Sequence, residues 1–190
     1  MRYDAEHKSQ SRRRIVEAAR TLFRRHGLDA PSIDQIMGGA GLTRGAFYAH
    51  FSSREQLVHE VLSIEPGLVT DLIAANDRAT ASQVLSRYLE PAQRADVAHN
   101  CPLVAHPVDV QRGDEERRLR YGARLDALIE ALGSGPAQLE DDAAVLVAVL
   151  TVGSALLSAA VADPDRADQL EAVASAVVRR ILGERTDPEP

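Results

Sequence analysis

The side chains best suited to chemistry gather in a short segment between positions 43 and 50. Thr43, Arg44, Tyr48 and His50 supply a hydroxyl, a guanidinium, a phenol and an imidazole. Each of these groups can donate a hydrogen bond, and an arginine can also pair with a phosphate or with a guanine edge. Gly45 stands among them, and a glycine lets a helix backbone approach a ligand without an intervening side chain. The pattern indicates a nucleic-acid-binding surface; an ordinary helical hairpin with a solvated face is the alternative.

The distribution of charge favours a polyanionic partner for the first third of the chain. The net charge of the whole chain is −6, but residues 1–60 carry ten Lys and Arg against seven Asp and Glu. Residues 61–190 carry twelve against twenty-one. Most of the early basic residues fall between Lys8 and Arg25. Such an asymmetry suggests that the first part of the chain faces a polyanion and the remainder does not.

Cys101 is the only cysteine and the second candidate for chemistry. Pro102 suits the first position of a helix, which would place the thiol at a helix N-terminus, where its pKa can fall. A redox or electrophile sensor is therefore one reading, and an inert buried thiol is the other. His99 and His106 could join Cys101 as metal ligands, but their spacing matches no strong zinc motif. Because no orienting acid or oxyanion element accompanies them, we expect no metal, no cofactor and no enzymatic activity.

The apolar pattern predicts the helices that must position these groups. We expect a first helix that starts near Ser9 or Ser11, after a frayed tail at 1–8, and ends at Gly27. Ser32 would cap a second helix over 33–39, and Thr43 a third over 44–50. A fourth helix follows the capping-box signature at 52–56. Two short helices that flank a glycine-bearing turn form a helix-turn-helix, whose second helix can enter the major groove of DNA.

The rest of the chain predicts further helices and no strand. Apolar residues make up 45% of the chain and aromatic residues only 4%, and alternating runs typical of strands are missing from the sequence. We expect helices at about 81–89, 103–111, 115–132, 139–162 and 166–182, followed by a disordered tail at 184–190. The fold class is therefore all-α.

One apolar stretch, residues 143–162, is long enough to cross a membrane. It is rich in small residues, contains Thr151, Ser154 and Ser158, and has acidic residues on both sides. These features favour a buried helix of a soluble protein. The charged N-terminus lacks the apolar core of a signal peptide. A single cysteine suits a reducing compartment, so we expect a cytoplasmic protein with no membrane partner.

The run GLDAPSIDQIMGGAGLTRGAFYAHFSSREQL closely resembles the N-terminal signature of the TetR (tetracycline repressor) family, and the likeness extends over residues 12–62. The resemblance implies a three-helix DNA-binding domain at 1–55 and a helical ligand-binding and dimerisation domain at 56–183. It places Arg44, Gly45, Tyr48 and His50 on the recognition helix, and matches Thr43, Arg54 and Ser32 to positions that contact DNA. The pair Gly38-Gly39 departs from the family pattern and is expected to loosen the second helix.

The resemblance also implies an apolar effector pocket among the central helices and a dimer built from the last two long helices. Candidate pocket residues are Leu85, Tyr88, Leu89, Cys101, Leu103, Tyr121, Leu125, Leu128 and Leu156. Two apolar stripes at helical spacing independently suggest the dimer contacts, namely Val147, Leu150, Ser154, Leu157, Val161, Leu170, Val173, Val177 and Ile181.

Together these patterns predict a homodimeric regulator that binds double-stranded DNA at a palindromic operator and is released by a small-molecule effector. Two alternatives remain open from the sequence. One is a regulator that senses oxidants or electrophiles through Cys101, and the other is a DNA-binding protein without an effector.

Overall fold

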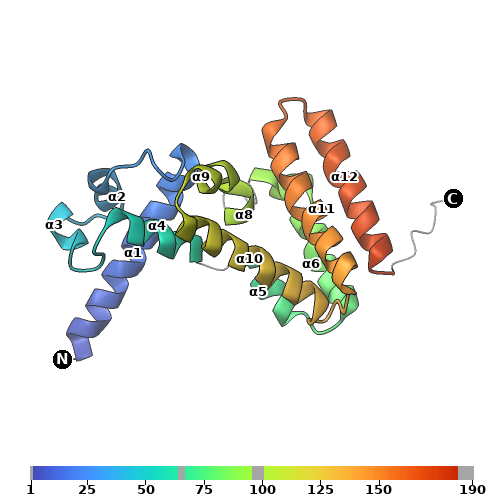
Figure 1. The fold of residues 1–190 in the computed structure, drawn as a ribbon, viewed down its shortest axis with the longest axis horizontal. Helices are drawn as coiled ribbons and strands as arrows, with labels where there is room; N and C mark the ends of the chain where they lie inside the picture. Colours follow the sequence, from blue (N-terminus) through green and yellow to red (C-terminus); the bar gives the residue numbers. More distant parts are fainter. Residues whose placement is uncertain (1, 64–66, 96–100, 184–190) are drawn as a thin grey trace. The chain divides into compact units, whose positions relative to one another are not determined.

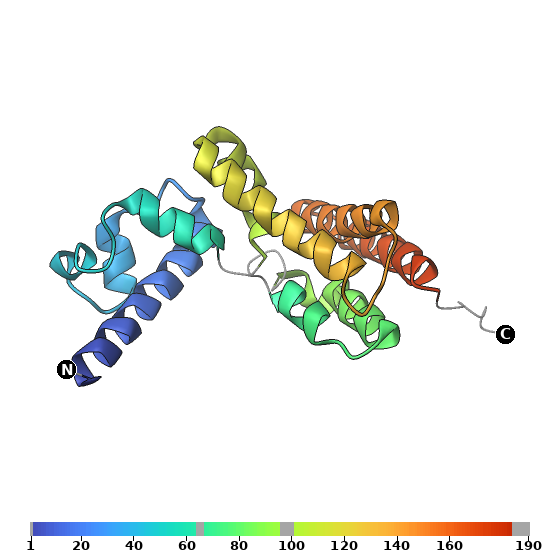
Figure 2. The same cartoon turned by 60° about the horizontal axis from the view of Figure 1, so that its bottom comes forward.

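The computed structural model describes residues 2–63, 67–95 and 101–183, and every regular element within them is a helix (Figures 1 and 2). The expected all-α class is therefore confirmed. The expected tail at 184–190 and His99 lie outside the described residues. The chain divides into two compact units. Unit 1 contains residues 1–64 and 106–121, and unit 2 contains residues 65–105 and 122–190.

Unit 1 contains the predicted helix-turn-helix together with the following helix and a later segment of the chain, residues 106–121. Its helices are α1 (Arg2–His26), α2 (Ile33–Gly39), α3 (Arg44–Phe47), α4 (Arg54–Ser63), α9 (Pro107–Arg112) and the start of α10 (Glu115–Gly133). The sequence placed a domain boundary at residue 55, whereas the structure groups α4 and residues 106–121 with the N-terminal helices.

The expectation of a frayed tail at residues 1–8 is wrong, because α1 begins at Arg2. Neither glycine nor proline interrupts the chain before Gly27, so nothing stops the helix from continuing toward the N-terminus. Gly27 ends α1 as predicted. Its φ is +80°, and its N–H donates to the carbonyl of Phe23 at 2.8 Å.

The turn between α2 and α3 follows local rules. The Ser32 hydroxyl accepts from the N–H of Gln35 at 3.2 Å, and the Gln35 side chain accepts from the N–H of Ser32 at 2.8 Å. This reciprocal capping box starts α2, which runs through Gly39 although two glycines lie in its last turn. Gly41 has a φ of +63°, the left-handed conformation that favours glycine.

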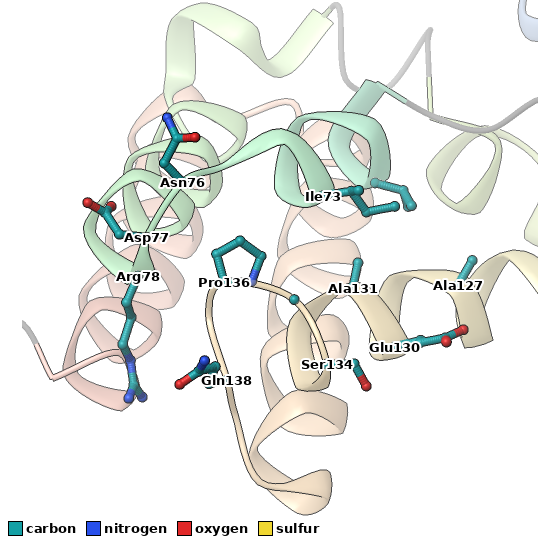
Figure 3. Close-up of a pocket in the computed structure, with 12 residues that line it drawn as sticks. Ile73, Asn76, Asp77, Arg78, Ala127, Glu130, Ala131, Ser134, Pro136 and Gln138 are labelled. Carbon is teal, nitrogen blue, oxygen red and sulfur yellow. The ribbon is translucent and has the colours of Figure 1, made fainter.

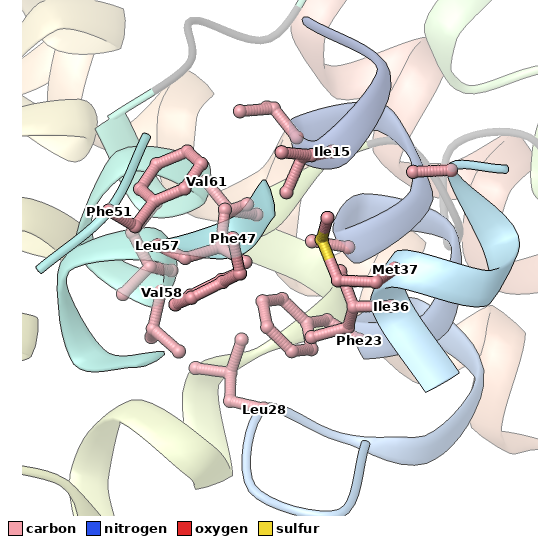
Figure 4. Close-up of a cluster of buried hydrophobic side chains, with 14 of the residues drawn as sticks. Ile15, Phe23, Leu28, Ile36, Met37, Phe47, Phe51, Leu57, Val58 and Val61 are labelled. Carbon is pink, nitrogen blue, oxygen red and sulfur yellow. The ribbon is translucent and has the colours of Figure 1, made fainter. Parts of the chain in front are cut away.

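Three phenylalanines form the centre of the core of unit 1 (Figure 4). Phe23 comes from α1, Phe47 from α3, and Phe51 from the turn before α4. All three are fully buried or nearly so, and the rings of Phe47 and Phe51 stack with centroids 5.5 Å apart. α4 closes the core with Leu57 and Val58. Burial of these large side chains holds the short helices in place, since helices of this length are marginal on their own.

Unit 2 contains α5 (Gly67–Ala74), α6 (Arg78–Tyr88), the 3-10 turn η1 (Pro91–Gln93), α8 (Pro102–Ala105), the later part of α10, α11 (Asp141–Ala160) and α12 (Pro164–Ile181). The single helix expected at 103–111 is instead two helices, α8 and α9. The break falls at His106-Pro107, because a proline inside a helix removes one hydrogen bond and clashes with the preceding turn.

α11 and α12 lie side by side in both views (Figures 1 and 2). α11 is long and apolar enough to span a membrane, with a mean hydropathy of 2.2. In the structure one face of α11 is buried within unit 2 through small side chains, among them Ala144, Ala148 and Thr151. The predicted buried helix is therefore found for one face only, because 39% of the apolar window is buried.

A buried acid is central to the packing of α12. Glu171 is almost fully buried, and its carboxylate accepts from Arg94 Nε at 2.8 Å and Nη2 at 2.9 Å. It also accepts from the Ser158 hydroxyl at 2.7 Å. These hydrogen bonds join Arg94, after η1, and Ser158, at the end of α11, to Glu171 on α12. The two donors replace the water that the carboxylate loses on burial.

We expect Arg94→Ala to lower the free energy of unfolding by about 2 kcal/mol, because it leaves the Glu171 carboxylate buried without its charged partner. Arg87→Ala is the matched control. Arg87 pairs with Asp71 at 3.5 Å where both side chains are more than half exposed, and such pairs contribute little. Urea denaturation of both variants measures the difference, and equal losses would contradict this account.

Candidate nucleic-acid interface

α3 presents the residues that the sequence predicted for a recognition helix. The side chain of Arg44 is 60% exposed and Tyr48 is 59% exposed. A Cβ atom added at Gly45 would meet no other atom within 4 Å, so open space lies over this part of the helix. The surface at Gly45 is therefore open, and the neighbouring Arg44 and Tyr48 side chains reach solvent.

The core of unit 1 fixes the position of Tyr48. Its ring meets that of Phe47 edge to face, with centroids 5.3 Å apart and an interplanar angle of 86°. Phe47 is completely buried, so an exposed aromatic ring rests on an anchored one. This packing limits the orientations of Tyr48 and prepares its phenol for a defined contact.

Arg44 has a partner within unit 1 that the sequence analysis missed. Its guanidinium lies 2.6 Å from the carboxylate of Asp34 on α2. Both side chains are more than half exposed, so the pair contributes little to stability and can separate easily. The acid stands ten positions before Arg44, a spacing that gives no periodic signal in the sequence.

Thr43 and His50 occupy the two ends of the predicted recognition segment. Thr43 is the N-cap residue of α3, as predicted, but its side chain makes no cap hydrogen bond. α3 is also shorter than predicted and ends at Phe47, so that Tyr48 is its C-cap and His50 lies in the following turn. Burial lowers the pKa of His50, and the nearby charges of Lys8 and Arg12 lower it further. The lowered pKa favours the neutral form of the imidazole.

Arg54 lies where its guanidinium binds the loop between α1 and α2. Its Nε donates to the carbonyl of Pro31 at 3.1 Å, and its Nη2 donates to the carbonyl of Leu28. The guanidinium carbon is also 5.4 Å from the centre of the Phe23 ring. These contacts give Arg54 a positioning role, because they hold the start of α4 against the loop that leads to α2.

Another arginine, which the sequence analysis did not select, has a similar role. Arg12 lies over the ring of Phe51 at 4.2 Å, donates to the carbonyl of His50 and pairs with Glu60 on α4. Part of the basic cluster of α1 is thus used to fasten α1 to the segment after α3. Sequence position alone cannot separate such arginines from those that face solvent.

Arg117 joins the later segment of unit 1 to the N-terminal helices. It is 5% exposed, and it donates to Glu55 at 2.6 and 3.0 Å and to Asp29 at 2.8 Å. The bond to Glu55 raises the pKa of Arg117, and the bond from Arg117 lowers that of Asp29. The N–H of Leu28 also donates to Asp109 at 3.1 Å. Residues 106–121 are therefore bonded to the helix-turn-helix at several points.

The residues predicted for an effector pocket have diverse environments in the structure. Leu85, Leu89, Leu103 and Leu128 are buried apolar side chains, Leu125 is half-buried and Leu156 is exposed. Tyr121 packs against the core of unit 1. Tyr88 hydrogen-bonds to Cys101, which is buried. Burial raises the pKa of the Cys101 thiol, which is opposite to the lowering expected for a reactive cysteine.

A pocket of about 910 Å³ lies elsewhere in unit 2 (Figure 3). The end of α5 and the start of α6 form one side, and the last turns of α10 with the loop after it form the other. Its lining combines apolar groups, such as Ile73 and Ala131, with the charged side chains of Asp77, Arg78 and Glu130. The sequence analysis selected none of these residues.

α11 and α12 carry an exposed apolar face. Of the residues predicted for a dimer contact, Leu157, Val173 and Val177 are exposed. Val147 and Ser154 are buried inside unit 2, and Leu150, Val161, Leu170 and Ile181 are half-buried. Val145, Leu146 and Val149, which the sequence pattern did not select, add to the exposed face.

The sequence of the N-terminal helices is similar to a known family of bacterial proteins. The family model of the bacterial regulatory proteins of the tetR family matches residues 15–61. The uncharacterized HTH-type transcriptional regulator YfiR of Bacillus subtilis is 30% identical over 131 residues, which are 66% of this chain and 63% of that protein. The HTH-type transcriptional repressor KstR2 of Rhodococcus jostii is 36% identical over 84 residues, 44% of this chain and 40% of that protein. The chain thus spans less than two thirds of the length of these relatives.

Solved structures share the fold over most of the chain. The reduced form of NemR from Escherichia coli has a TM-score of 0.71 at 16% identity, and the match covers 90% of this chain and 96% of that one. A TetR-family transcriptional regulator from Streptomyces coelicolor has a TM-score of 0.68 at 20% identity, covering 93% and 97%. At these identities the likeness concerns the fold alone.

The different surroundings of Arg54 and Arg44 predict different effects on stability. Arg54→Ala should lower the free energy of unfolding by about 2 kcal/mol, because it removes the donors to two backbone carbonyls. Arg44→Ala should change it by less than ~0.5 kcal/mol, because its ion pair is exposed. Chemical denaturation compares the two variants. An Arg44→Ala loss as large as that of Arg54→Ala would show that α3 depends on its exposed ion pair.

Proposed function

The chain belongs to the TetR family of bacterial regulatory proteins, and from this membership we propose that it is a transcriptional regulator that binds double-stranded DNA through α3. The observation that carries the proposal is the surface of α3. It combines an exposed guanidinium and an exposed phenol with a glycine over which no atom lies within 4 Å of an added Cβ.

Each polar residue of this surface has a distinct role in the proposal. Arg44 leaves Asp34 and pairs with a phosphate or a guanine edge, and Gly45 lets the helix backbone come close to the groove. Tyr48 and Thr43 donate hydroxyl hydrogen bonds, and His50 contacts the DNA as a neutral imidazole. Ser32 and Arg54 hold α2 and α4 in position, since their side chains already bond within unit 1.

We further propose that the protein acts as a homodimer. The exposed apolar side chains of α11 and α12 support this, because exposure of several large apolar groups on two adjacent helices is unfavourable in water; they are Val145, Leu146, Val149, Leu157 and Val173. Two copies joined there would present two α3 helices to a palindromic operator. Such a protein would work in the cytoplasm, where the DNA is.

We propose that the regulator is a repressor that a small molecule releases from DNA. Its relative KstR2 is named as a transcriptional repressor, which supports the first part of this proposal. The pocket of about 910 Å³ in unit 2 has the size of a small-molecule site. Sensing through Cys101 has less support, because the thiol is buried and its pKa is raised. Retention of operator binding throughout a library of small amphipathic compounds would favour the alternative of a regulator without an effector.

Three substitutions on one surface test DNA binding, because two of them should lower the affinity and one should raise it. Arg44→Ala should weaken specific binding by ~1–3 kcal/mol, because it removes a charged contact. Asp34→Asn should strengthen binding, because it frees Arg44 and removes a negative charge near the DNA. Gly45→Ala should weaken binding without loss of stability, because the added methyl meets nothing inside the protein. Fluorescence anisotropy with an operator duplex measures all three, and unchanged affinities would remove α3 from the interface.

A charged substitution on the exposed face of α11 tests the dimer. Val149→Glu should raise the dissociation constant of the dimer by about 100-fold or more, because it buries a carboxylate without a partner. Val108→Glu is the control, since this valine on α9 is also about half exposed but lies outside the proposed face. Analytical ultracentrifugation gives the oligomeric state. A Val149→Glu protein that stays dimeric would place the interface elsewhere.

A further inference from the structure

His59 on α4 faces two carboxylates of unit 1. Its Nε2 atom lies 3.4 Å from Glu55 Oε1 and 3.6 Å from Asp114 Oδ2. The three ligand-type atoms all lie within 4.8 Å of one another. Glu55 and His59 are four positions apart on one face of α4, while Asp114 directly precedes α10. The helix and the loop thus bring an imidazole and two carboxylates to one point.

The two distances from His59 Nε2 fit the edges of a metal tetrahedron better than they fit hydrogen bonds. Zinc binds nitrogen and oxygen ligands at ~2.0–2.2 Å. Neighbouring ligand atoms of a tetrahedron with such bonds are about 3.4 Å apart. The two distances from Nε2 match this value, and both exceed the usual length of an N–H···O hydrogen bond.

Each ligand atom keeps a lone pair for a cation. His59 Nε2 is buried and has no hydrogen-bond partner among the described residues. Asp114 uses Oδ1 to accept from the N–H of Arg117 at 2.8 Å, and Oδ2 remains toward His59. Glu55 accepts from Arg117 with both oxygens, but a carboxylate oxygen has two lone pairs. Arg117 therefore orients Glu55 as an outer partner of a metal ligand would.

We propose that Glu55, His59 and Asp114 form a binding site for Zn²⁺ or a similar transition-metal ion. An imidazole ligand favours this class over Mg²⁺ and Ca²⁺, which prefer oxygen ligands alone. The fourth ligand position opens to a pocket of about 420 Å³ lined by Ser53, Gln56, Glu60, Ser63 and Arg120. A water molecule from this pocket can complete the tetrahedron.

The charges around the site leave it favourable for a cation. Arg117 is the nearest positive group, but Asp29 shares it with Glu55. Arg120 faces the pocket and pairs with Glu116 at 2.6 Å. The two carboxylate ligands therefore keep much of their negative charge. A bound ion would fasten α4 to the start of α10 and so stabilise unit 1.

Titration of the untagged, chelator-treated full chain with ZnCl₂ in a calorimeter tests the site. We expect one Zn²⁺ per chain with micromolar affinity, and a weakening of at least about tenfold in His59→Gln and in Asp114→Asn. Both variants should fold, because His59 Nε2 makes no hydrogen bond and an asparagine can still accept from Arg117. His26→Gln, on the exposed end of α1, should bind Zn²⁺ like the original protein.

Cobalt gives a second readout of geometry. Co²⁺ bound to the original protein should show the strong visible bands of tetrahedral coordination, and His59→Gln should lose them. Zinc binding that is weak, unsaturable or unchanged in His59→Gln would overturn the proposal, as would the faint spectrum of six-coordinate Co²⁺. These outcomes do not bear on DNA binding, because operator affinity is measured separately with variants of α3.

Discussion

The organisation of unit 1 depends on the burial of one guanidinium. Arg117 is nearly inaccessible to water, so its charge must be balanced inside the protein. Asp29 from the loop before α2 and Glu55 from α4 supply that balance, and each can reach Arg117 only if both segments keep their places. The same loop carries the carbonyls that Arg54 binds. A single ion-pair network therefore connects residues 106–121 with the frame that holds α3, and it makes this later segment an integral part of the N-terminal unit.

Local rules explain which parts of the fold the sequence could predict. The capping box of Ser32 and Gln35 and the left-handed Gly27 depend on residues close together in the chain, and the expected elements appear there. The start of α1 was missed because a charged helix without an apolar stripe resembles a tail. Arg117 was missed for another reason. Its partners lie 62 and 88 positions away, and no periodic pattern records such a contact.

The candidate sites show the same limit at the level of side chains. Arg44 and Tyr48 are exposed, whereas Phe47 is completely buried. The sequence could not separate these residues from Arg12 and Arg54, because all four carry suitable groups and only packing decides which of them face inward. On α11, small apolar residues surround the helix, so its face was predicted with the wrong phase. Val147 lies inside, whereas Val149 lies outside.

In the proposed complex with DNA, Asp34 would compete with phosphate groups for Arg44, because the two side chains form an exposed ion pair. Added salt screens the attraction of Arg44 to phosphate, but it also screens the attraction of Arg44 to Asp34. The two losses partly cancel, so the ionic strength of the medium should change the affinity less steeply than the number of cationic contacts implies. The protein would then discriminate between DNA sequences over a wider range of salt concentration. The reason is that Asp34 always weakens the nonspecific attraction of Arg44 to phosphate.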